Sequence, residues 1–179
     1  VYVHAIWEGS GNVIALDVLR AIEHGALPGY LGDQERRAEA ASSNPATAPL
    51  ASVLLQQLGA IERAVGALPD DPQQRQLPLR RLARRMAQVA IGARLAEQGA
   101  AFLDDAGSGR LAWIAARYLA RLGGEPVVAQ LADDPSWLPH ADALLHGGDV
   151  PAEVAHRAAT TLQRALRDAG VSEPASLAR

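Results

Sequence analysis

The chain has 179 residues, contains no cysteine and carries a formal net charge of −3. Without cysteine the chain has no disulfide, no thiolate nucleophile and no cysteine-ligated metal, and we expect a cytoplasmic location. The slightly negative charge provides no bulk attraction to nucleic acid or to an anionic membrane, and no apolar run is long enough to span a bilayer, so we expect no membrane partner.

The composition favours helices over strands. Alanine is abundant, leucine and arginine follow, and Phe102 is the only phenylalanine, so few residues that prefer strands compete. Several helical periodicities follow one another with short connections, which is typical of an antiparallel bundle. We therefore predict an all-α chain that folds as an antiparallel helix bundle.

The segment Trp7-Glu8-Gly9-Ser10-Gly11-Asn12 is the part of the chain that most resembles a chemical site. Its glycines would let a ligand approach the backbone closely, and Ser10 or Asn12 can cap a following helix. We expect that helix to run from about Gly11 or Asn12 to His24 and to end at Gly25. Free N–H groups at its start would suit an anionic or electron-rich ligand.

Residues 31–49 are polar and predict a loop that contains at most one short exposed helix, over residues 34–41. A second helix is expected after Thr47, which is placed to cap it. Its apolar residues alternate at spacings of four and three, the pattern of a packing seam. They are Leu50, Leu54, Leu58, Ile61, Val65 and Leu68.

A break over residues 68–78 precedes the third expected helix, which is long and carries small residues, including Gly92, where a neighbouring helix could pack closely. Ser108 is placed to cap a fourth helix that has Leu111, Ile114, Tyr118 and Leu122 on one face. Short helices are expected over residues 127–132 and 137–145, and Pro151 opens a final helix. The stripe of the third helix consists of Leu79, Leu82, Met86, Val89, Ala93, Ala96, Ala100 and Leu103, and that of the final helix of Val154, Ala158, Leu162 and Leu166.

The sequence from Ile6 to Ile22 resembles the C-terminal active-site motif of the acyl-CoA dehydrogenases, in which a Tyr-Glu-Gly-Thr type sequence carries the catalytic glutamate. The sequence Trp-Glu-Gly-Ser-Gly-Asn is more similar to the motif of the adaptive-response, AidB-type branch of this family, which is isovaleryl-CoA dehydrogenase-like. Val3, His4 and Ala5 depart from the Pro-x-Asn-Ser that commonly precedes the motif.

The resemblance implies a fold and an assembly. Residues 1–122 would be the C-terminal helical domain of the acyl-CoA dehydrogenase fold, and residues 123–179 would add short helices and a C-terminal helix. The chain would then be the last part of a longer protein, whose N-terminal helical domain and β-domain are its closest partners. The family also implies a homotetramer built as a dimer of dimers.

The resemblance further implies FAD as cofactor and an acyl-CoA as substrate. Glu8 would be the general base that removes the α-proton of the acyl thioester while the flavin accepts a hydride. Gly9 would lie beside the substrate, whereas Trp7, Ser10, Gly11 and Asn12 would lie beside the flavin. Judged without the resemblance, Glu8 is better explained as a first-turn carboxylate. The alternative for Gly9 to Asn12 is plain helix capping, and for Trp7 a core aromatic is an equally good interpretation.

An arginine cluster is the second candidate feature, because Arg81, Arg84 and Arg85 share a face at helical spacing. Such a face could contact phosphates, and the AidB-type branch is associated with binding of double-stranded DNA. The stronger alternative is a solvated or inter-subunit face whose arginines pair with nearby aspartates. The five histidines show no metal-ligand spacing, so we expect no metal site.

The leading hypothesis is an FAD-dependent acyl-CoA dehydrogenase-like oxidoreductase that is incomplete in this chain alone. Two alternatives remain open: a DNA-associated alkylation-stress flavoprotein with little dehydrogenase turnover, and a non-catalytic helical assembly module. Flavin absorbance separates the first two from the third, and bleaching of the flavin by acyl-CoA separates the first from the second.

Overall fold

The computed structural model of the chain describes the backbone of residues 2–171 and the side chains of residues 13–75 and 78–171. Within that part of the chain every regular element is a helix, which confirms the predicted all-α class. The helices are α1 (Tyr2–Glu23), α2 (Leu27–Ser42), α3 (Ala48–Gly66), α4 (Pro72–Ala106), α5 (Arg110–Leu119), α6 (Glu125–Ala132), α7 (Ala141–His146) and α8 (Ala152–Asp168), with 3₁₀ turns at Ala120–Gly123 and Pro135–His140.

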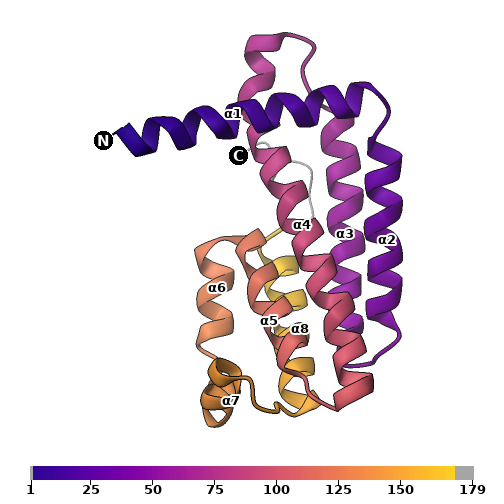
Figure 1. Ribbon diagram of the computed structural model, residues 1–179, viewed down its shortest axis with the longest axis vertical. Helices are drawn as coiled ribbons and strands as arrows, with labels where there is room; N and C mark the ends of the chain where they lie inside the picture. The colour runs from indigo at the N-terminus through magenta and orange to yellow at the C-terminus, as the bar shows by residue number, and fades with distance from the viewer. Residues whose placement is uncertain (1, 172–179) are drawn as a thin grey trace.

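The helices form a bundle with α4 at its centre. Helices α2 and α3 lie side by side along α4, while α5 packs against the second half of α4, and α8 contacts both α5 and α3 (Figure 1). One hydrophobic cluster takes buried residues from α2, α3, α4, α5, α6 and α8, including Val127 and Leu162. Residues before and after position 122 thus share one core.

Large apolar residues mark the buried faces of three helices, as the spacing predicted. In α3, Leu50, Leu54, Leu58 and Ile61 are buried, and Val65 and Leu68 pack against them. All eight residues of the predicted stripe on α4 are buried, as are the four on α8. Burial of such side chains is the main stabilising contribution to a bundle of this kind.

The predicted close approach at the middle of α4 is also present. A Cβ atom added at Gly92 would collide with the side chain of Leu119 in α5. One added at Gly99 would lie 2.9 Å from the Cα and the backbone nitrogen of Ala112, also in α5. Helix α5 therefore lies against α4 at a distance that only glycine permits at these two positions.

The short helix predicted over residues 34–41 is present but longer than expected, and the predicted loop is confined to residues 43–47. The helix is α2, which buries Gln34, Ala38 and Ala41 against α3 and α4. Its polar residues are held on the outer side, where Asp33 accepts hydrogen bonds from Arg36 and Arg37, and Arg37 also reaches Glu97 of α4 at 2.7 Å. The helix was predicted too short and too exposed because its buried stripe, Gln34, Ala38 and Ala41, contains no large apolar residue.

Two helix starts also differ from the predictions. Helix α4 begins at Pro72, after Asp71 accepts a hydrogen bond from the backbone N–H of Gln73, and continues through Pro78. Ser108 does not cap α5, because its hydroxyl accepts a hydrogen bond from the backbone N–H of Val150 instead. The buried face of α5 consists of Ala112, Ala115, Ala116 and Leu119, and of the predicted stripe only Leu122, beyond the helix end, is buried.

Candidate functional site

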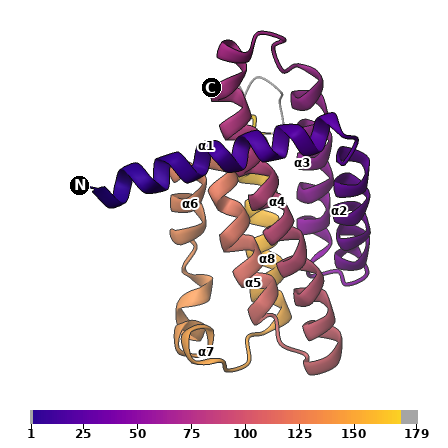
Figure 2. The same cartoon turned by 45° about the horizontal axis from the view of Figure 1, so that its top comes forward.

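The motif that suggests catalysis lies in the first half of α1. That half projects beyond the other helices, whereas the second half of α1 crosses α4 toward α2 (Figures 1 and 2). The backbone is helical from Tyr2, so Ser10 and Asn12 do not start a helix, and no free N–H groups are presented at Gly11. The expected helix start was wrong, although α1 ends as predicted, with Gly25 at a φ of 82°. The anion-binding turn inferred from that start is therefore not formed in this chain.

The side chains of the predicted site residues lie outside the described part of the chain. These residues are Trp7, Glu8, Gly9, Ser10, Gly11 and Asn12. Their backbone forms two helical turns, in which each interior glycine costs about 1 kcal/mol relative to alanine. The motif is thus a weak helix former held in a helix, and the roles assigned to its side chains stay predictions.

The second half of α1 leaves an apolar face without a partner. Ala15 is buried against Leu79 and Ala83 of α4, with Val18 and Leu19 beside it. On the other sides of the helix, Val13 and Ile14 are 58% and 59% exposed. Together with Leu16, which is 46% exposed, they form an apolar surface on α1 that is suited to contact another polypeptide.

The three arginines predicted to share a face are separated by the fold. Arg84 is exposed and Arg81 is half-buried, but Arg85 is buried in the core. Its guanidinium donates to the carbonyl oxygens of Leu122 at 2.7 Å and Val171 at 3.1 Å. Arg85 is therefore a structural residue that joins α4 to the ends of two later segments, and the prediction that it contacts nucleic acid was wrong.

Burial also changes the acid–base behaviour of Arg85. No carboxylate among the described residues pairs with this guanidinium, so removal from water lowers its pKa to about 10. Desolvation favours the neutral form of a base, and the two carbonyl groups compensate only in part. The charge is held by backbone dipoles rather than by a partner ion, which is a structural use of arginine.

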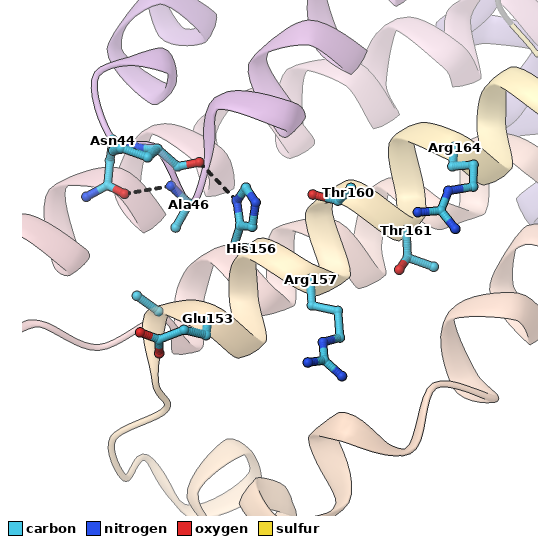
Figure 3. Close-up of a pocket in the computed structure, with 10 residues that line it drawn as sticks. Asn44, Ala46, Glu153, His156, Arg157, Thr160, Thr161 and Arg164 are labelled. Atoms are coloured by element: carbon cyan, nitrogen blue, oxygen red, sulfur yellow. Dashed lines mark hydrogen bonds between the residues drawn. The ribbon is translucent and has the colours of Figure 1, made fainter.

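A cavity of about 690 Å³ lies over the outer face of α8 (Figure 3). One edge is the connection between α2 and α3, and the rest is α8 itself. The side chains of Arg157, Thr161 and Arg164 follow one another along the helix in the close-up view. The cavity is lined by Asn44, Pro45, Ala46, Ala152, Glu153, His156, Arg157, Thr160, Thr161 and Arg164.

Hydrogen bonds fix the edge of this cavity. Nδ1 of His156 is 3.1 Å from the carbonyl oxygen of Pro45, so that nitrogen carries a hydrogen and donates it. The amide of Asn44 donates to Asp104 at 2.7 Å, and its oxygen accepts from the backbone N–H of Ala46 at 2.9 Å. The connection is thereby held to both α4 and α8, and the groove has a rigid wall.

Sequence reasoning missed this groove. The two segments that form it are 111 residues apart at the bond between His156 and Pro45, and no local pattern relates them. The one available signal is on α8, where Arg157, Thr161 and Arg164 are spaced by four and three residues and so share a face.

In the described part of the chain, no group of three or more histidine, aspartate or glutamate side chains is arranged to hold a metal ion. No helix among the described residues is both long enough and apolar enough to cross a membrane.

Comparisons with models of protein families, with curated proteins and with solved structures found no match. The motif between Ile6 and Ile22 is therefore the basis of any assignment to a family, and the helix bundle is the fold on which it sits.

Proposed function

We propose that the chain is the C-terminal helical part of an acyl-CoA dehydrogenase-like flavoprotein that binds FAD in its complete, oligomeric form. The observation that carries the proposal is the segment Trp7 to Asn12, whose residues match the active-site motif of that family in order and spacing. The unpartnered apolar face at Val13 and Ile14 supports it, because a helix that carries part of an active site must pack against the segments that complete the site.

In the proposed reaction Glu8 removes the α-proton of the acyl thioester, and the bound flavin supplies the acceptor for the β-hydride. Gly9 leaves room for the thioester to approach the backbone. Ser10, Gly11 and Asn12 would face the flavin, and Trp7 would pack beside its ring. The cavities described over α5 and α8 have no α1 residue in their walls. In this proposal other segments or subunits complete the flavin pocket.

The geometry favours this proposal over nucleic-acid binding by the arginine cluster. Burial of Arg85 removes one of the three arginines that would have contacted phosphates. A DNA-binding face needs several cations that converge on the backbone phosphates, because affinity depends on the number of phosphates neutralised.

The test is Glu8→Gln in the flavin-loaded protein, with the rate of flavin reduction by acyl-CoA as the measurement. Loss of a general base is expected to slow this step by about 10²- to 10⁴-fold. Asp17→Asn is the matched control, because Asp17 is an exposed acid on the same helix whose only described ion pair is with Arg20. Equal reduction rates in the Glu8 variant and the control would remove the base assignment.

A further inference from the structure

A second cavity, of about 270 Å³, lies between the end of α5 and α6. The charged residues in its wall are both arginines, Arg117 in the last turn of α5 and Arg121 in the 3₁₀ turn that follows. The other lining residues are Ile114, Tyr118 and Val128. This wall contains two positive charges and no carboxylate, so its charge favours an anionic ligand.

Both guanidinium groups lie over aromatic rings. Cζ of Arg117 is 5.6 Å from the centroid of the Trp113 ring. Cζ of Arg121 is 5.3 Å from the centroid of the Tyr118 ring. A guanidinium that packs on a ring keeps the N–H groups in its own plane available for hydrogen bonds. Because these contacts already restrict the two side chains, an anion that binds them costs less conformational entropy than one that binds freely moving arginines.

The fold leaves the hydrogen-bond donors of these two arginines unused. Neither side chain makes an ion pair or a side-chain hydrogen bond within the described part of the chain. Nη1 of Arg117 is buried there without a hydrogen-bond partner, so Arg117 gains more from an acceptor that reaches it than a solvated arginine does. Arg121 is exposed, as Arg84 and Arg167 are, but among the described residues those two lie over no aromatic ring.

We propose that this cavity binds a phosphate monoester that carries a small apolar group. Two guanidinium groups match the charge of a phosphate monoester, about −1.5 to −2 at neutral pH, better than that of a single carboxylate. Ile114, Val128 and the ring of Tyr118 provide apolar surface for the organic part. The volume of about 270 Å³ is below the roughly 300–1,000 Å³ of pockets for drug-sized ligands, so the ligand must be small. This inference is independent of the proposed flavin chemistry.

The experiment is an NMR titration of the ¹⁵N-labelled 179-residue chain with phenyl phosphate at constant ionic strength. The Nε–Hε signals of Arg117 and Arg121 and the backbone signals of Ile114 and Val128 are expected to shift together. Inorganic phosphate and benzoate should each bind at least about fivefold more weakly, because the first lacks an apolar group and the second carries a single charge. Equal affinity for either of them, or no shift at the two arginines, would overturn the proposal.

Single substitutions test whether these arginines hold the phosphate. Arg121→Gln should leave the fold intact, because Arg121 is exposed, and should weaken binding of phenyl phosphate by about tenfold. Arg117→Lys keeps the charge but loses the planar fork, and should weaken binding as well. The matched control, Arg84→Gln, removes the same charge from an exposed position on α4 and should leave the affinity within about twofold. Equal losses in Arg84→Gln and Arg121→Gln, with unchanged circular dichroism spectra, would show nonspecific attraction and contradict the proposal.

Discussion

The contact between α4 and α5 leads to a prediction about stability at Gly99. This residue is buried, and a Cβ atom added to it would lie 2.9 Å from two backbone atoms of Ala112 and 3.2 Å from its Cβ. A backbone cannot rotate away as a side chain can, so Gly99→Ala must push the two helices apart. Overpacking of this kind costs about 2–3 kcal/mol, the upper part of its usual range. The better helix propensity of alanine returns about 1 kcal/mol. We expect a net destabilisation of about 1–2 kcal/mol.

Gly32→Ala in α2 is the matched control, because its new Cβ would be in ordinary contact, 3.8 Å from the end of Arg36. This variant gains helix propensity without overpacking, so it should be about 1 kcal/mol more stable than the parent chain. Urea unfolding followed by circular dichroism measures both free energies of unfolding, provided that the slopes with denaturant agree. The two melting temperatures should differ by about 5–10 °C. If Gly99→Ala were as stable as Gly32→Ala, the close approach of α4 and α5 would be refuted.

Two further predictions concern α1 and the interior of α2. Ile14→Glu should change the free energy of unfolding of this chain by less than about 0.5 kcal/mol, because the side chain is 59% exposed. The same substitution should abolish flavin retention by the complete protein. Leu145→Glu, at a residue of α7 that is 77% exposed, is the control that should retain flavin. Tyr30→Phe should cost about 1 kcal/mol, since it removes a 2.8 Å hydrogen bond to the carbonyl oxygen of Met86. Burial raises the pKa of Tyr30 above its ordinary value of about 10, so the folded state keeps this proton longer than the unfolded state. The stability linked to Tyr30 is therefore fully present below pH 10 and decreases as the pH rises toward the folded-state pKa. The phenylalanine variant should lose less stability than the parent chain above pH 10. Urea unfolding at a series of pH values measures this difference. An unchanged alkaline slope would contradict the burial of the Tyr30 hydroxyl.

Sequence periodicity predicted the fold well where large apolar residues mark the buried face. The seams of α3, α4 and α8 contain leucine, isoleucine, valine or methionine at helical spacing, and these residues are buried. Sequence periodicity failed where alanine forms the interface, because alanine occurs on both the buried and the exposed sides of these helices and so does not mark the buried side. For this reason α2 was predicted only as a short exposed helix over residues 34–41, and α5 was predicted to bury the face of Ile114 rather than that of Ala115.

The site was less predictable than the fold. Arg85 was grouped with Arg81 and Arg84 by charge, although it is three residues after Leu82 and four before Val89, both of which are buried. That spacing was the available signal that Arg85 points inward. The start of α1 was misjudged because the glycines in the motif favour a break locally, whereas the backbone stays helical through them. The groove over α8 depends on a contact between distant segments, which no local pattern contains.

The central claim is that the segment around Glu8 belongs to an acyl-CoA-reducible flavin site. The most direct measurement is the visible absorbance of the purified, complete protein before and after anaerobic addition of acyl-CoA. The account predicts a flavin spectrum that acyl-CoA bleaches. A protein without flavin, or one whose flavin is unchanged by acyl-CoA, would contradict it.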